Sequence, residues 1–309
     1  MSVKYMYLHA GGGFNDILMG LYNALKFCEE TDRVLLFDLA QTFYGVPFDR
    51  YFSWPDDKVI TDKSVIEEIL SRDLSVFPPQ LTGRSHMIMD GSVRFGFTPD
   101  PVIEVRGREG TPKETIKYSA PDPSVQEDLI VHTRCGGGFN GVDMLYLFHF
   151  SKPLVDNALR NLSLLSSPYL FLHIRGTDFP GNDPVEEIIS NHKDILQSYE
   201  DVYLATDDIN VIDAFDKEGI LYKNFSTFPS RPDRNYITLH ENYGTDKHIP
   251  WKPISLHRSS VDGSQQIKDI VSDLFLCANA GEFIQSVGGF SKLLSTVHKN
   301  QKFIDKFYT

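Results

Sequence analysis

A segment that ends in charged residues offers the first chemistry in this sequence. Residues 169–174 (YLFLHI) form a short apolar run, and Arg175 and Asp178 follow it. Such a run predicts a buried strand, and in open α/β sheets ligands bind just beyond the carboxyl ends of the strands. The planar guanidinium of Arg175 suits a diphosphate, with Asp178 holding it in place. The alternative is a structural Arg–Asp pair at the end of a strand.

A second candidate site is a glycine turn between a predicted strand and a predicted helix. The residues are Val287-Gly288-Gly289-Phe290-Ser291-Lys292. Free backbone N–H groups and the helix dipole make such a helix start attractive to anions, and the Ser291 hydroxyl can donate a further hydrogen bond. The alternative is a helix that begins in this way without binding a ligand.

A third candidate is Asp273, which interrupts an otherwise apolar helical run (IVSDLFLCANA). A carboxylate in that setting needs partners, because burying it alone is costly. It can accept hydrogen bonds from both the ring N–H and the exocyclic amine of guanine, whereas uracil offers one ring N–H. Asp273 therefore favours a guanine nucleotide, and a solvent-facing or capped aspartate is the alternative.

Two sequence motifs that commonly bind metals, D-x-D and C-x-x-C, are absent from the sequence. It contains no D-x-D pair, which holds the divalent ion in metal-dependent transferases that use nucleotide sugars. Cys28, Cys135 and Cys277 are far apart and form no C-x-x-C, so neither a zinc site nor a disulfide framework is indicated. We expect no metal and no cofactor. The charge on a leaving diphosphate would then be met by Arg175 and helix N-termini.

Composition narrows the class of partner. The 309 residues carry a net charge of −12, with a pI near 5.3 and no Lys/Arg-rich run, which argues against nucleic acid as a main partner. The first residues (MSVKYMYLHAGGG) lack the apolar core of a signal peptide, and no apolar run approaches the roughly 20 residues of a membrane helix. We expect a cytoplasmic protein without a membrane span.

The first half begins with a βαβ pattern of Rossmann type. A predicted strand (4–9) leads through glycines to a predicted helix with Asn15 or Asp16 as N-cap, and a second strand follows (34–39). The glycines do not spell G-x-G-x-x-G, which disfavours a Rossmann oxidoreductase. They still allow a ligand or a second domain to approach the backbone closely, and a tight turn is the alternative.

The region from Thr42 to about Asp128 is broken by prolines. We expect a helix over 64–71, a strand over 103–106, and substrate-side loops around them. The pentapeptide Gly-Gly-Gly-Phe-Asn occurs at 11–15 and again at 136–140. Because the flanking residues differ and the spacing is too long for a solenoid, we interpret the recurrence as a coincidence.

The second half alternates predicted strands and helices, which favours a parallel sheet. The predicted helices are 154–165, 185–199, 209–217, 264–280 and 290–297, and the predicted strands are 169–174, 202–205 and 283–287. The chain therefore predicts an α/β protein of two Rossmann-like domains, residues 1–153 and 154–309.

Four motifs, in their order, resemble those of the α1,2-, α1,6- and protein O-fucosyltransferase superfamily. Residues 173–178 (HIRGTD) resemble its H-x-R-R-x-D motif, and residues 202–208 (VYLATDD) look like the second motif of the α1,6 branch, which includes the bacterial nodulation enzymes. The run from Asp273 to Ser291 resembles the third motif. Residues 12–16 (GGFND), with the helix and strand that follow, are similar to the family's opening turn. Residues 42–146 have no clear counterpart.

The resemblance implies a GT-B architecture, in which two Rossmann-like domains face each other across a cleft. The donor nucleotide lies on the C-terminal domain, and the acceptor side is the N-terminal one. The family inverts the anomeric carbon, mostly uses GDP-fucose and needs no metal. By position, Arg175 binds the β-phosphate, His173 and Asp273 bracket guanine, and Ser291 with Gly288, Gly289 and Phe290 holds phosphate.

By the same resemblance, Asp183 stands where the α1,6 branch has a glutamate proposed as general base, and Asp16 and Asp178 are the next candidates. Asn15 and Asp16, on the turn with Gly13 and Phe14, would face the sugar or the acceptor. The chain departs from the family at Gly176, where many members have a second arginine. This departure leaves open another donor sugar such as xylose, or a non-catalytic protein that binds a nucleotide or a sugar.

Overall fold

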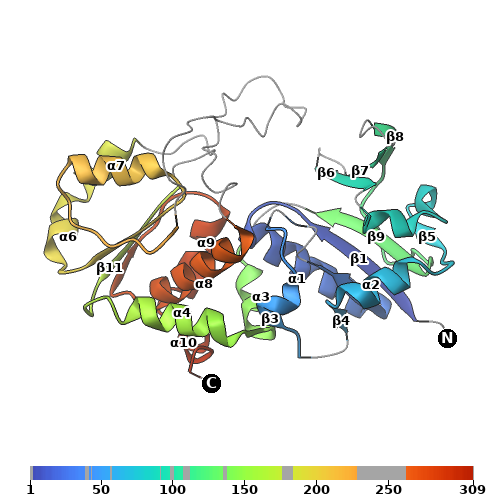
Figure 1. Cartoon of the computed structure of the whole chain (residues 1–309), viewed down its shortest axis with the longest axis horizontal. Helices are drawn as coiled ribbons and strands as arrows, with labels where there is room; N and C mark the ends of the chain where they lie inside the picture. The colour runs from blue at the N-terminus through green and yellow to red at the C-terminus, as the bar shows by residue number, and fades with distance from the viewer. Residues whose placement is uncertain are drawn as a thin grey trace. The chain divides into compact units, whose positions relative to one another are not determined.

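Parallel β-sheets flanked by helices form both halves of the chain (Figure 1). The computed structural model describes residues 3–38, 42, 44–55, 58–90, 92–97, 101–106, 112–134, 138–175, 184–227 and 262–308. It has two compact units, Met1–His149 and Phe150–Thr309. The α/β class with parallel sheets is confirmed. Asp178 and Asp183 lie outside the described residues.

The first unit is built on a five-stranded sheet. Its strands, in spatial order, are β4 (Val59–Ile60), β2 (Arg33–Phe37), β1 (Lys4–Ala10), β9 (Leu129–Arg134) and β5 (Val76–Phe77). All four pairings are parallel. The predicted βαβ unit is confirmed as β1, helix α1 (Phe14–Thr31) and β2. The other helices of this unit are α2 (Lys63–Leu70) and α3 (Gly141–Leu147), besides short 3₁₀ turns.

Helix α1 begins earlier than predicted, because its N-cap is Gly13 rather than Asn15 or Asp16. Asp16 caps the helix from the third helical position, where its Oδ2 accepts a hydrogen bond from the Gly13 N–H at 2.9 Å. A carboxylate there satisfies an orphan donor of the first turn and lies at the positive end of the helix dipole.

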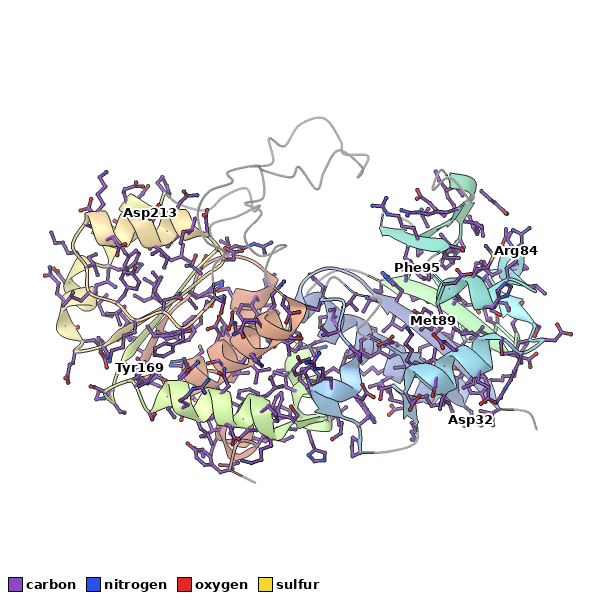
Figure 2. The ribbon with its side chains drawn as sticks, viewed as in Figure 1. Asp32, Arg84, Met89, Phe95, Tyr169 and Asp213 are labelled. Carbon is purple, nitrogen blue, oxygen red and sulfur yellow. The ribbon has the colours of Figure 1, made fainter. Side chains whose placement is uncertain are left out.

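The region predicted to be substrate-side loops contains a second sheet. Strands β6 (Val93–Phe97), β7 (Pro101–Arg106) and β8 (Pro112–Lys117) form an antiparallel meander. Ile103 joins Tyr7, Val131 and Phe95 in one apolar cluster, so the meander covers one face of the main sheet. Phe95 (Figure 2) also stacks on His9, with 4.3 Å between ring centroids. The predicted strand 103–106 is confirmed within β7, and the predicted helix 64–71 corresponds to α2. The expectation of loops was wrong for β6 and β8, because short strands between prolines carry little sequence signal.

The second unit is built on a three-stranded parallel sheet. Its strands, in spatial order, are β12 (Val202–Thr206), β11 (Leu170–Ile174) and β13 (Glu282–Ile284). Its helices are α4 (Lys152–Leu162), α5 (Val185–Asn191), α6 (Lys193–Ser198), α7 (Ile209–Lys217), α8 (Gly263–Asn279), α9 (Gly289–Val297) and α10 (Gln301–Asp305). The short strands β3 (Phe52–Ser53) and β10 (His149–Phe150) complete the described elements.

Strand β11 lies between helices in the second unit (Figure 1), and its side chains alternate between the two sides. Leu170, Leu172 and Ile174 pack on the side of α5, α6 and α7. Tyr169, which precedes the strand and is labelled in Figure 2, points the other way and donates its hydroxyl to the Leu276 carbonyl of α8 at 2.6 Å. Because the strand has a period of two, His173 and Arg175 share the α8 side with Tyr169.

The helix predicted over 185–199 is divided in two by His192. His192 has φ −113° and ψ 12°, so it ends α5 and precedes α6. The apolar positions continue across the break, which is why the sequence suggested one helix. In the part of the chain that the structure describes, no helix has the length and apolar character needed to cross a membrane.

Candidate functional site: a guanidinium at the start of helix α9

Arg175 lies at the carboxyl edge of the second sheet, directly after β11. Its backbone N–H donates a hydrogen bond to Ser286 Oγ at 3.2 Å. Ser286 follows β13, the strand that pairs in parallel with β11. Because parallel strands end at the same edge, the topology brings the residue after β11 next to the turn that leads into α9. The position of Arg175 therefore follows from the sheet.

Gly288 lets the Arg175 side chain approach this turn closely. A Cβ atom at Gly288 would lie 2.5 Å from Arg175 Nη1, closer than real Cβ atoms come to other atoms, and 3.1 Å from Arg175 Cδ. The guanidinium would therefore have to move. Gly288 also has φ +99°, a conformation that residues with side chains rarely adopt. Glycine suits position 288 because it leaves room for the guanidinium and adopts this φ without strain. The Arg175 side chain and the turn at Gly288 therefore depend on each other.

The electrostatics of this feature favour an anion. Gly288 is the N-cap of α9, so the guanidinium lies at the positive end of a helix dipole. Both groups attract anions, and one anion can contact both. Ser291, in the first turn of the helix, is fully buried, and its Oγ has no hydrogen-bond partner among the described residues. These groups are the donors that a phosphate group requires.

His173 lies two residues before Arg175 on the same side of β11. The imidazole is 6% exposed, and it meets the ring of Phe290 edge-on, with the centroids 5.7 Å apart. The structure thus brings together the predicted residues His173, Arg175, Gly288, Phe290 and Ser291, with Gly289 as the first residue of α9. Their roles in binding a donor stay predictions.

Asp273 is buried in the middle of α8, with 1% of its surface exposed. Its Oδ1 accepts a hydrogen bond from the hydroxyl of Tyr203 in β12 at 2.7 Å. Burial and the neighbouring carboxylate raise the pKa of Tyr203 far above its usual range, so the phenol keeps its proton and remains a donor. Asp273 is therefore neither solvent-facing nor a helix cap. Its predicted contact with guanine stays a prediction.

The four predicted residues of the first unit, Gly13, Phe14, Asn15 and Asp16, form the N-cap and first turn of α1. Phe14 packs into the core against Tyr44 and Phe52, with ring centroids 6.4 and 6.2 Å apart. Asn15 is 2% exposed, and Gly13 and Asp16 make the capping hydrogen bond described above. Ligand roles for these residues stay predictions.

Asn15 also connects the two Gly-Gly-Gly-Phe-Asn segments. Its Nδ2 donates to the carbonyl of Gly138 at 3.0 Å, and a Cβ at Gly141 would lie 2.7 Å from its Oδ1. The first segment follows β1 and the second follows β9, and these strands are parallel neighbours. Asn15 of the first copy and Gly138 of the second, which we interpreted as recurring by coincidence, are thus hydrogen-bonded neighbours.

Two residues of the site were missed by sequence reasoning. Tyr203 holds Asp273, and Ser286 accepts the hydrogen bond of the Arg175 backbone. A buried tyrosine in a strand needs a polar partner, and that requirement was the signal available for Tyr203. Its partner lies 70 residues away, so only the fold identifies it. No comparable signal marked Ser286.

Comparison with solved structures shows the fold. The fucosyltransferase NodZ from Bradyrhizobium superposes with a TM-score of 0.56 at 14% identity, over 96% of this chain and 94% of that one. A NodZ α-1,6-fucosyltransferase crystal soaked with GDP-fucose gives a TM-score of 0.55 at 13% identity, over 96% and 93% of the two chains. No family model and no curated protein matches the sequence. The resemblance to fucosyltransferases seen in the motifs is thus confirmed for the fold.

The close approach of Gly288 and Arg175 can be tested with two alanine variants. Gly288→Ala should lose stability and also lose most of the thermal stabilisation that inorganic pyrophosphate gives the wild type, because its Cβ displaces the guanidinium. Gly219→Ala is the matched control, since Gly219 has φ +67° and nothing within 4 Å of an added Cβ. It should lose about 1–2 kcal/mol from backbone strain and keep the response to pyrophosphate. Equal responses of the two variants would contradict the assignment.

The hydrogen bond between Tyr203 and Asp273 predicts a loss of stability in Tyr203→Phe. Removing the hydroxyl leaves a buried carboxylate with one donor fewer, which should lower the free energy of unfolding by about 1.5–3 kcal/mol. Tyr308→Phe provides the control, because Tyr308 is 63% exposed, and we expect little change there. Urea unfolding of both variants measures the difference, and an unchanged midpoint in Tyr203→Phe would refute the expectation.

Proposed function

We propose that this chain is a glycosyltransferase that transfers a sugar, with fucose as the first choice, from a GDP-activated donor to a hydroxyl of a glycan acceptor. The observation that carries the proposal is the guanidinium of Arg175 lying against Gly288 at the start of α9. A nucleotide-sugar donor carries its diphosphate at the bond that breaks, so the anion site and the reacting bond coincide. The shared fold with NodZ, crystals of which were soaked with GDP-fucose, supports this choice of donor.

The reaction divides into two charge movements. The acceptor oxygen attacks C1 of the donor sugar, the C1–oxygen bond to the β-phosphate breaks, and the configuration at C1 inverts. Negative charge then grows on the departing diphosphate, where Arg175 and the α9 N-terminus stabilise it more strongly than in the ground state. These groups do the work that a divalent ion performs in D-x-D transferases, so we propose a metal-independent reaction.

The acceptor hydroxyl must also lose its proton, which requires a carboxylate base within hydrogen-bond reach. Asp183 is the first choice from the sequence, and Asp16 and Asp178 follow. Asp16 already accepts the Gly13 N–H, and this bond stabilises its ionised form and makes it a weaker base. This geometry supports ranking Asp16 behind Asp183.

The base of the nucleotide would be read by Asp273, with His173 on the other side of the ring. Each carboxylate oxygen has two lone pairs, so the bond from Tyr203 leaves acceptor capacity on Asp273. Guanine presents the two adjacent N–H donors that such a carboxylate binds best. This chemistry supports GDP over UDP as the carrier.

Replacement of Arg175 by alanine tests the proposal directly. Arg175→Ala should lower kcat for transfer or donor hydrolysis by about 10²–10³, as loss of a group that stabilises transition-state charge does elsewhere. Arg160→Ala is the control, because Arg160 lies on α4 of the same unit and bonds only Asn157 at the surface. Full turnover in a folded Arg175→Ala protein would reject the assignment.

A donor panel separates the proposed transferase from its alternatives. GDP-fucose, GDP-mannose, UDP-xylose and UDP-glucose are compared for thermal stabilisation and turnover, with and without EDTA. We expect GDP-fucose to be used and EDTA to leave the rate unchanged. Turnover of UDP-xylose would point to another donor on the same scaffold. Stabilisation by a donor without turnover would identify a binding protein, and a rate that EDTA abolishes would overturn metal independence.

A further inference from the structure

Strand β9 carries polar side chains near its carboxyl end, within the otherwise apolar face of the first sheet that α1 covers. Leu129 and Val131 belong to the cluster on the meander side. Since side chains alternate, His132 and Arg134 lie on the opposite face, next to Leu8 and Ala10 of β1 in the strand register. A histidine and an arginine thus follow one another along the face of the sheet that α1 covers.

A cavity of about 270 Å³ lies over these residues. Its floor is formed by Met6, Leu8 and His132, one wall by α1, and the other wall by Ala120 and Pro121. Sites for drug-sized ligands measure about 300–1,000 Å³, so this cavity suits a molecule the size of one sugar ring. All of its lining belongs to the first unit, whereas the anion site at α9 belongs to the second.

The donors in the cavity point to an anionic group. Arg134 is exposed at the rim, and its side chain makes no hydrogen bond or ion pair with any described residue. The Nδ1 atom of His132 is covered and has no hydrogen-bond partner among those residues either, whereas Nε2 is not covered in this way. Covering a bare lone pair costs less than covering an N–H, so the proton lies on Nε2, which then donates into the cavity.

His132 keeps this neutral form across the physiological range. Burial, and secondarily the charge of Arg134, lowers its pKa to about 4. The charged groups of the lining are therefore the guanidinium of Arg134, the ammonium of Lys26 and the carboxylate of Glu30. A carboxylate pairs well with a guanidinium and one neutral N–H donor.

The remaining lining suits a hydroxylated ring. Glu30 carries acceptor oxygens, and Asn23, whose Nδ2 donates to the Met19 carbonyl at 2.6 Å, keeps its carbonyl oxygen for a ligand. Phe27 and Pro121 offer apolar surface for the C–H groups of a sugar. We propose that this cavity binds an acidic monosaccharide, with its carboxylate at Arg134 and His132 and its hydroxyl groups toward Asn23 and Glu30.

Binding of D-glucuronate to the full-length protein tests the proposal. D-Glucose has the same ring without the carboxylate, and acetate has a carboxylate without the ring. Isothermal titration at constant ionic strength should show saturable binding of glucuronate, and glucose and acetate should each bind at least about tenfold more weakly. Absence of saturable glucuronate binding would overturn the proposal, as would equal binding of glucose or acetate.

Two arginine variants locate the binding. Arg134→Gln should weaken glucuronate binding by about tenfold or more and leave the response to GDP unchanged. Arg94→Gln is the matched control, since Arg94 is an exposed arginine on β6 of the same unit, and it should bind as the wild type does. Undiminished binding in Arg134→Gln would place the ligand elsewhere and reject the site. Because the readout is binding to the first unit, failure here is distinct from failure of the proposed transferase activity.

Discussion

The candidate active site depends on one electrostatic constraint, a guanidinium placed at the positive end of a helix. Arg175 lies against Gly288, the residue that precedes α9, and no larger residue fits between them. A guanidinium and the N–H groups of a helix start both attract anions. The diphosphate of a nucleotide sugar has the charge to engage both groups. The function proposed here uses both.

Strand alternation decides which residues face that site and which form the core. Along β11, Leu170, Leu172 and Ile174 join the apolar cluster, and the residues between them point to α8. The same period of two places His132 and Arg134 of β9 over the cavity of the first unit. In both units a strand inside a parallel sheet thus packs apolar residues on both sides and carries polar residues on one of them near its carboxyl end.

The central parts of this arrangement could be predicted from the sequence. A short apolar run marks β11, so Arg175 could be placed at a strand end, and glycines before an amphipathic run mark the start of α9. The predicted helix 209–217 is also found, with Asp208 as its N-cap. These signals are local. Strands β6 and β8 of the meander were missed because they are short and separated by prolines, and the break at His192 has no distinct residue signature.

Contacts between residues far apart in the chain could not be predicted, and Asp273 shows why. Its position in an apolar helix indicated that it needs a partner, but the partner is a strand residue chosen by the sheet topology. The Gly-Gly-Gly-Phe-Asn recurrence is a similar case. Asn15 of the first copy contacts Gly138 of the second because β1 and β9 are neighbours in the sheet, although β9 comes more than a hundred residues after β1 in sequence.

In the proposed complex, different groups of the protein would bind the diphosphate and the base of the donor. The diphosphate would contact Arg175 and the backbone at α9, whose geometry is fixed by the sheet and by Gly288. The base would meet Asp273, which Tyr203 locks in one orientation inside a buried helix. A carboxylate held in this way cannot turn to suit another base without losing that bond, so the proposed choice of base would be tied to packing in the core. Gly176, where the motif resemblance leads us to expect a second arginine, lies outside the described residues. Among the described residues, a change of base would therefore require a coupled change at Tyr203 and Asp273.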